Sequence, residues 1–121
     1  MKVKTAELTG TALDWAVAKC EWDELAMLNI QYPQYAAHFP KISPSTDWSK
    51  GGQIVERECI KLAAYEASSE VPKNPAYWEA VICTWWKTYR QTGPTALIAA
   101  MRCYVSAAIG EEVEIPKELQ P

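Results

Sequence analysis

The sequence predicts an α+β domain in which a small antiparallel sheet packs against two main helices. Two stretches, one toward each end of the chain, have apolar residues at helical spacing. Between them, residues 60–65 and 77–88 have the alternation and the aromatic or β-branched side chains of strands. The chain has no strand–helix–strand repeat that would predict a parallel sheet. Its 121 residues suit one domain, 1–121, with a single core.

The first helix is predicted over residues 11–20. Its apolar side chains recur at helical spacing: Leu13, Ala16, Val17 and Cys20. Thr11 and Asp14 have the spacing of a capping pair, and Asp14 also suits the positive end of the helix dipole. We expect a short amphipathic helix that packs its apolar stripe on the sheet.

Residues 21–44 have a less regular pattern. Residues 24–29 have the composition of a short strand. Residues 32–44 contain three prolines, which exclude a long helix or a central strand. We expect an ordered loop anchored by aromatic side chains, and a candidate rim of a binding site, because long loops in compact domains are often functional.

The polar run from Ser45 to Lys50 is typical of a helix start, and the following Gly51 and Gly52 allow tight backbone turns. The helix is predicted to continue from Ile54 to about residue 58. The strands at 60–65 and 77–88 follow, joined by a polar hairpin loop at 68–75. One face of the second strand is predicted to carry Trp78, Ala80, Ile82, Thr84 and Trp86.

The last helix is predicted to open at Gly93-Pro94-Thr95, since proline is tolerated at the first helical position. Its apolar stripe consists of Leu97, Ile98, Met101, Tyr104, Val105 and Ala108. Gly110 is a helix stop, and residues 113–115 have the pattern of a short strand.

The composition argues against several function classes. No apolar run is long enough to span a bilayer, and no signal core follows the N-terminus, so we expect a cytoplasmic protein. The four cysteines are far apart, which favours reduced, half-buried thiols over disulfides or zinc ligands. His38 is the only histidine, and no catalytic set is evident, so we expect neither enzyme activity nor a cofactor. A net charge of −3 without a basic stripe argues against broad nucleic-acid binding.

The aromatic composition indicates binding instead. Six tryptophans and six tyrosines accompany one phenylalanine, and the polar atoms of Trp and Tyr suit half-exposed positions in pockets and interfaces. The candidate ligand-binding residues are Ser45, Thr46, Asp47, Trp48, Gly51, Gly52, Arg57, Trp78, Thr95 and Arg102.

Each group in this set has a structural alternative. The Ser/Thr/Gly residues form either an anion-binding nest or an ordinary helix cap. Trp48 is either the wall of a site or a lid on the core. Arg57 and Arg102 are a candidate pair for gripping a phosphate. The structural alternative is that Arg102 pairs with Glu56, Glu58 or another carboxylate. The predicted strand tryptophans either stack on a base or belong to the core: Trp78, Trp85 and Trp86.

Three stretches together resemble the NinX family of small proteins from lambdoid phages and prophages. They are residues 11–20, residues 45–52 with Ile54 and Glu56 to Glu58, and residues 93–102 with Tyr104 and Val105. The resemblance implies a phage or prophage gene expressed in a bacterial cytoplasm, with no established enzyme activity. The Ser-Thr-Asp pattern and the alanine-rich last helix are also similar to phage domains described as α-β-α sandwiches, which favours helices on both faces of the sheet.

Three functional hypotheses follow. The first is a protein that sequesters a nucleotide-like or other phosphorylated ligand and so interferes with host defence. The second is a protein-interaction module that binds a host protein, a phage protein or a second copy of the chain through exposed aromatic residues. The third, a metal-dependent nucleotide hydrolase, ranks last because no metal-ligand cluster is present.

Overall fold

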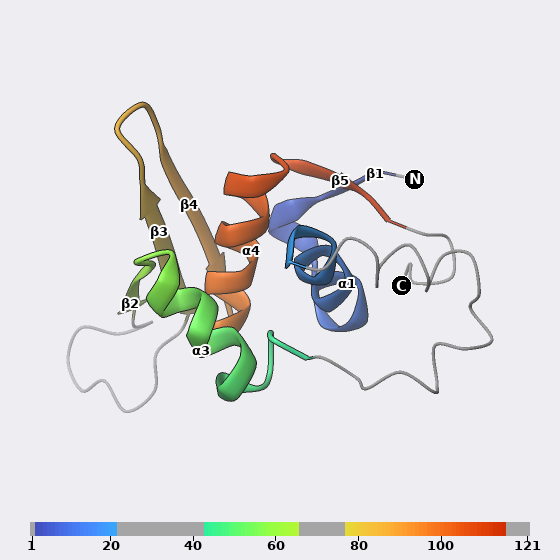
Figure 1. The fold of residues 1–121 in the computed structure, drawn as a ribbon, viewed down its shortest axis with the longest axis horizontal. Helices are drawn as coiled ribbons and strands as arrows, with labels where there is room; N and C mark the ends of the chain where they lie inside the picture. Colours follow the sequence, from blue (N-terminus) through green and yellow to red (C-terminus); the bar gives the residue numbers. More distant parts are fainter. Residues whose placement is uncertain (1, 22–42, 66–76, 116–121) are drawn as a thin grey trace.

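The computed structural model describes residues 2–21, 43–65 and 77–115 (Figure 1). Its elements are β1 (Lys2–Lys4), the 3-10 turn η1 (Thr5–Glu7), α1 (Gly10–Glu21), α3 (Trp48–Arg57), β2 (Lys61–Tyr65), β3 (Tyr77–Cys83), β4 (Thr88–Gly93), α4 (Ala96–Ala108) and β5 (Glu112–Glu114). The predicted strand at 24–29, the proline-rich loop up to residue 42 and the hairpin loop at 68–75 lie outside the described residues.

Helix α4 is the centre of the fold. The antiparallel sheet β2-β3-β4 packs on one side of α4, and α1 and α3 pack against other sides of the same helix (Figure 1). The predicted α+β class is therefore confirmed. The predicted packing of the first helix on the sheet is wrong, because α1 packs chiefly on α4. Within the described residues, α4 covers one face of the sheet, and the sandwich arrangement with helices on both faces is not seen.

The sequence of α4 explains its central position. Thr95 caps the helix, accepting a hydrogen bond from the amide of Ile98 at 3.2 Å, so Pro94 precedes the cap rather than occupying the first turn. The helix is apolar around most of its circumference, as expected of a buried helix. Its buried residues are Leu97, Ala99, Ala100, Met101, Cys103, Tyr104, Val105 and Ser106. The predicted helix stop is confirmed at Gly110, which has a φ of 132°.

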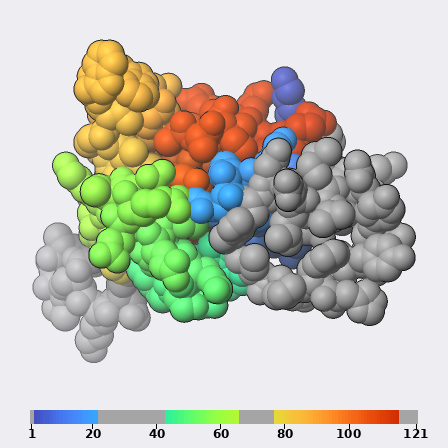
Figure 2. All heavy atoms as spheres, viewed as in Figure 1, coloured from blue at the N-terminus to red at the C-terminus, as the bar shows by residue number. Residues whose placement is uncertain are grey.

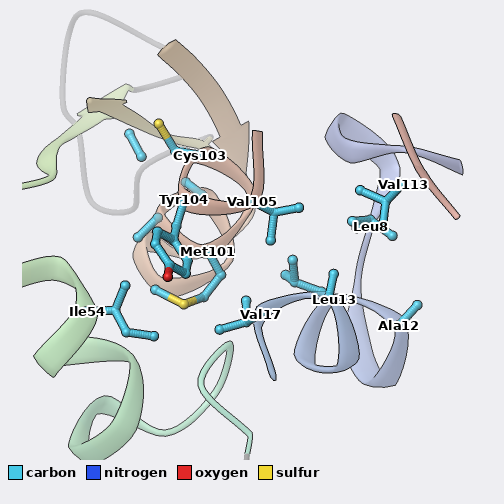
Figure 3. Close-up of a cluster of buried hydrophobic side chains, with 14 of the residues drawn as sticks. Leu8, Ala12, Leu13, Val17, Ile54, Met101, Cys103, Tyr104, Val105 and Val113 are labelled. Atoms are coloured by element: carbon cyan, nitrogen blue, oxygen red, sulfur yellow. The ribbon is translucent and has the colours of Figure 1, made fainter. Parts of the chain in front are cut away.

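The core fills the space between α4 and the elements around it. Figure 3 shows Leu13 and Val17 of α1 on the side of Met101 and Val105 of α4, with Ile54 of α3 nearby. All five side chains are at most 3% exposed. This apolar burial is the main stabilising contribution to the fold.

The β3–β4 hairpin corrects the longest predicted strand. The chain does not run straight from residue 77 to residue 88; it turns at Thr84–Lys87 and returns as β4. The Thr84 hydroxyl closes the turn by donating to the carbonyl of Lys87 at 2.6 Å and accepting from the Lys87 amide at 3.0 Å. The turn was missed because it contains none of the Gly, Asn, Asp or Pro residues that usually mark one. As a result, Trp85 and Trp86 lie in the turn and not on a strand.

Two helix starts also differ from the prediction. Helix α3 begins at Trp48, so Gly51 and Gly52 lie inside it rather than in a turn. A Cβ on Gly51 would come within 2.2 Å of the Pro44 carbonyl oxygen, so glycine here allows a close backbone approach. Helix α1 begins at Gly10, which puts Thr11 inside the helix and makes the predicted capping pair wrong.

The remaining strands largely follow the prediction. β2 pairs antiparallel with β3, as expected for the predicted hairpin. The short strand near residue 113 is confirmed as β5, and it pairs antiparallel with β1, which was not predicted. Three residues are too few to show a recognisable alternation, which explains why β1 was missed.

Candidate functional site

The most exposed aromatic side chains lie at the tip of the β3–β4 hairpin. Trp85 is 92% exposed and Trp86 is 64% exposed. Their rings meet edge to face, with centroids 5.2 Å apart and planes at 80°. The hairpin tip, in gold, projects from the body of the molecule in Figures 1 and 2. We call these two residues the tryptophan tip.

The backbone of the turn holds the tip in place. Besides the two bonds of the Thr84 hydroxyl, the Thr84 amide donates to the Lys87 carbonyl at 2.8 Å. Lys87 lies with its ammonium 5.0 Å from the centre of the Tyr89 ring. The tryptophan tip is therefore presented on an ordered turn with a cation at its base.

Below the tip, the face of the sheet opposite α4 carries further aromatic residues. Tyr65 of β2 and Tyr77 of β3 stack with ring centroids 5.1 Å apart, and each is 41% exposed. Arg90 of β4 donates to Glu79 of β3 at 3.2 Å across the same face. Tyrosine is enriched in protein interfaces, and polar groups are typical of an interface rim.

The predicted anion-binding nest at the start of α3 already contains a carboxylate, that of Asp47. Asp47 is the N-cap, accepting from the amide of Ser49 at 2.9 Å and from its hydroxyl at 2.7 Å. These bonds hold the pKa of Asp47 below its usual value. The Gly51 amide donates to the Asp47 carbonyl at 2.9 Å, within the helix. A ligand anion here would face a carboxylate and find this glycine amide already bonded.

Ser45 and Thr46 serve the same turn. The Ser45 amide donates to Asp14 of α1 at 2.9 Å, which ties the start of α3 to the first helix. Burial raises the pKa of Asp14, while its bonds with Ser45 act in the opposite direction. The Thr46 hydroxyl lies 3.5 Å from the Ser43 carbonyl. Trp48 is 55% exposed and lies beside Gly52.

Arg57 is engaged in an ion pair with α1. Its two terminal nitrogens donate to the two carboxylate oxygens of Glu21, and the Tyr104 hydroxyl of α4 donates to Glu21 at 2.6 Å. The Arg57 bond lowers the pKa of Glu21, whereas burial and the Glu21 bond raise the pKa of Tyr104. The main carboxylate partner is Glu21 rather than Glu58, which lies 3.8 Å away.

Arg102 has a different environment. Its Nε donates to the Leu8 carbonyl at 2.7 Å and its Nη1 to the Thr92 carbonyl at 2.8 Å, and no carboxylate in the described part of the chain pairs with it. Burial lowers the pKa of its guanidinium. Arg102 and Tyr104 are two residues apart on α4, or roughly 200° around the helix. Because Arg57 contacts Tyr104, the two arginines lie on different sides of α4 and form no joint clamp.

The other two candidates have structural contacts. Thr95 caps α4, and Trp78 of β3 is half-buried and packs on the core. The ten predicted residues thus form no single binding set: those between Ser45 and Gly52 share the start of α3, whereas Arg57, Thr95 and Arg102 each bond to groups elsewhere. Trp85 and Trp86 were considered as stacking residues of a strand but were outside the ten predicted site residues, and the adjacent Trp-Trp pair was the signal that could have identified the tryptophan tip.

A concavity of about 220 Å³ lies between β4 and the end of α4. Its lining includes Lys87, Thr88, Arg90, Ser106, Ile109 and Glu111. None of these residues was among the predicted ligand-binding residues, because strand β4 was not predicted.

Among residues 2–21, 43–65 and 77–115, no three His, Cys, Asp or Glu side chains are grouped as metal ligands, and none of the helices has the length and apolar character needed to span a bilayer. The four cysteines are unpaired, but the expected half-buried state applies to one: Cys20 is partly buried, Cys103 is buried, and Cys59 and Cys83 are exposed. Burial raises the pKa of Cys103 to about 11, which keeps its thiol protonated.

Comparison with known families and proteins gave two results. The family model described as bacteriophage P22 NinX matches residues 4–107, which contain α1, α3, the three-stranded sheet and nearly all of α4. The curated proteins include no match. The family match covers the β3–β4 hairpin as well as the helical layers, which consist of α1, α3 and α4.

Proposed function

Because the chain belongs to the NinX family, we propose that it is a phage accessory protein that acts by binding and not by catalysis. Its partner in this proposal is a host or phage protein in the bacterial cytoplasm, captured through the tryptophan tip. The observation that carries the proposal is the exposure of Trp85, at 92%, at the end of a projecting hairpin.

The energetics of tryptophan support a binding role. An indole is among the largest apolar side chains, and most of its favourable burial energy is lost when it stays in water. Two adjacent exposed indoles therefore contribute little to the stability of this chain. Tryptophan is enriched among the few residues that dominate protein–protein affinity. Covering Trp85 and Trp86 with a partner would recover the burial energy that folding leaves unused.

The surroundings of the tip suit a protein surface. The turn is closed by three hydrogen bonds involving Thr84 and Lys87, so little ordering is needed on binding. The stacked Tyr65 and Tyr77 form a second exposed aromatic pair at the opposite end of β3 from the tip. The Arg90–Glu79 pair supplies polar groups of both signs at its side.

Sequestration of a nucleotide-like ligand is the second candidate. The observation in its favour is Arg102, whose guanidinium has no carboxylate partner in the described part of the chain. It has less support because Arg57 is held by Glu21 and the start of α3 carries Asp47. A thermal-shift screen with cyclic and linear nucleotides tests it, and a shift that Arg102→Gln abolishes would favour it over capture by the tip.

The proposed function is tested by capture from host and phage-infected lysates. The wild-type protein should retain one partner in stoichiometric amount, and Trp85→Ala/Trp86→Ala should lose it. Trp48→Ala is the matched control, since it removes an exposed tryptophan from α3 and should leave capture unchanged. Circular dichroism verifies that all variants are folded. Equal capture by the wild type and the double variant would refute the proposal, as would the absence of any partner.

A further inference from the structure

Strand β4 has an edge with no neighbouring strand in the described part of the chain. The sheet order is β2-β3-β4, so β4 pairs with β3 on one side only. In an antiparallel edge strand, every second residue points its N–H and C=O away from the sheet. The Thr92 carbonyl points outward, because it accepts from Arg102 of α4. By alternation, the backbone groups of Arg90 and Thr88 point the same way.

This edge opens onto the concavity beside α4. One wall consists of Thr88 to Gln91, and the other comes from the end of α4, with Ser106, Ile109 and Gly110. Arg102 is four residues before Ser106 and so shares its face of the helix. Its bond to Thr92 closes one end of the edge. What remains is a short edge of outward backbone donors and acceptors with a groove of about 220 Å³ beside it.

The charges along the groove favour an acidic occupant. Lys87, Arg90 and Glu111 lie in its lining. Arg90 already pairs with Glu79 at 3.2 Å, so Lys87 is the cation of the lining that no described carboxylate pairs with. Arg102, at the closed end, is partly buried against two carbonyl groups and has no counter-charge among the described residues. A partly buried guanidinium gains most from a carboxylate, which binds it with charge-assisted hydrogen bonds.

A second copy of the chain is a poor occupant. Antiparallel pairing of two copies of β4 centred on Arg90 would place Arg90 of one chain directly opposite Arg90 of the other. Like charges on facing strands are destabilising. The edge therefore suits a different polypeptide better than itself.

We propose that the free edge of β4 binds an extended, acidic polypeptide segment as an added strand, with a carboxylate of that segment on Arg102. Thr88 and Arg90 supply the backbone hydrogen bonds, and the concavity takes a side chain that points toward α4. This inference rests on the proposed function, in which the partner is a protein. It adds the edge of β4 to the tryptophan tip as a second contact surface.

The test measures fluorescence anisotropy of a labelled peptide with the full-length protein. The probe has about eight residues, a length typical of strands, and alternates Thr and Val with one Asp. Matched probes carry Asn or Lys in place of Asp. The Asp peptide should bind about tenfold more tightly than the Asn peptide, the factor expected for one charge-assisted hydrogen bond, and the Lys peptide should bind most weakly.

Two changes separate strand addition from simple charge attraction. Thr88→Pro removes an outward N–H at a position where an edge strand tolerates proline, and should abolish binding, whereas Thr88→Ala keeps the N–H and should retain it. Methylating the backbone nitrogens of the Asp peptide on its bonding edge removes the same hydrogen bonds without altering the protein. Arg102→Gln should make the Asp and Asn peptides bind equally.

Three results of the peptide measurements would contradict strand addition at β4. Failure of all three peptides to bind, equal binding of the Asp and Lys peptides, or full binding of the methylated peptide would each overturn it. Lysate capture reports on the tryptophan tip separately. If peptide binding fails while capture by the tip holds, only this inference is lost; if capture fails while the acidic peptide binds, only the proposed role of the tip is lost.

Discussion

Helices α1 and α4 bury their aromatic side chains, whereas the tip of the β3–β4 hairpin exposes its two tryptophans. In the helical layers, Trp15 is 5% exposed and Tyr104 is 8% exposed, and the Tyr104 hydroxyl bonds to Glu21. In the hairpin, Trp85 and Trp86 face solvent. The difference shows that the tryptophan and tyrosine content comprises aromatic residues packed in the fold and aromatic residues that face solvent.

The largest difference between the two regions should appear when a tryptophan is truncated. Trp15→Ala removes a buried indole from α1 and should lower the free energy of unfolding by about 4 kcal/mol. Urea unfolding measured by circular dichroism gives this value. A loss as small as that of Trp85→Ala would break the comparison, because it would mean that Trp15 does not pack in the core.

Backbone packing in the helical layers gives the next largest effect. Gly51→Ala places a Cβ 2.2 Å from the Pro44 carbonyl oxygen and 2.8 Å from Leu97, which should reduce the free energy of unfolding by about 3 kcal/mol. Gly52→Ala is the matched control, since its Cβ meets only the exposed Trp48, at 3.4 Å. This variant should gain about 0.5 kcal/mol from the better helix propensity of alanine. Equal effects in a thermal melt would contradict the close approach.

The ion pair between Glu21 of α1 and Arg57 of α3 should make the stability of the helical layers depend on pH. The pKa of Glu21 is lowered in the folded protein, chiefly by the Arg57 bond, from an ordinary value of 4.5. The folded state then binds fewer protons than the unfolded state, so the stabilisation is complete above the unfolded pKa and is lost as pH falls through the folded pKa. Glu21→Gln should be less stable than the wild type by about 2 kcal/mol at neutral pH.

Unfolding of Glu21→Gln and the wild type across the acid range checks this sign. The gap between them should narrow as pH falls below 4.5, the ordinary value for a glutamate. Glu58→Gln is the control, because Glu58 lies 3.8 Å from Arg57 and is more exposed than Glu21. A gap independent of pH would show that Glu21 contributes through packing and not through its charge.

The smallest stability effect is expected at the hairpin. Trp85→Ala/Trp86→Ala should change the free energy of unfolding by less than about 0.5 kcal/mol, because both indoles face solvent and contribute little packing to the fold. Chemical denaturation of the double variant provides the measurement. A loss comparable to that of Trp15→Ala would mean that the tip packs on the chain itself, and would remove the basis of the proposed function.

Most of the secondary structure followed from local patterns. The 3.6-residue spacing around Leu97, Met101 and Val105 predicted α4, and the alternation after Tyr77 predicted β3. The turn at Thr84–Lys87 was not predictable in this way, because Thr84 closes it with its side chain instead of relying on glycine or proline. The candidate site failed to converge for a related reason: the partner of Arg57 proved to be Glu21, 36 residues away in the chain.

The sequence alone determined the family, the α+β class and the central pair of predictions, a helix at each end of a strand-rich middle. These depend on periodicity, capping residues and short motifs, which are set by residues close together in the sequence. Only the tertiary structure decided which tryptophans are buried and which are exposed, and which arginine has a carboxylate. Those properties depend on contacts around α4 between segments that are far apart in the chain. Residue spacing within one segment does not indicate which helix and sheet faces pack together.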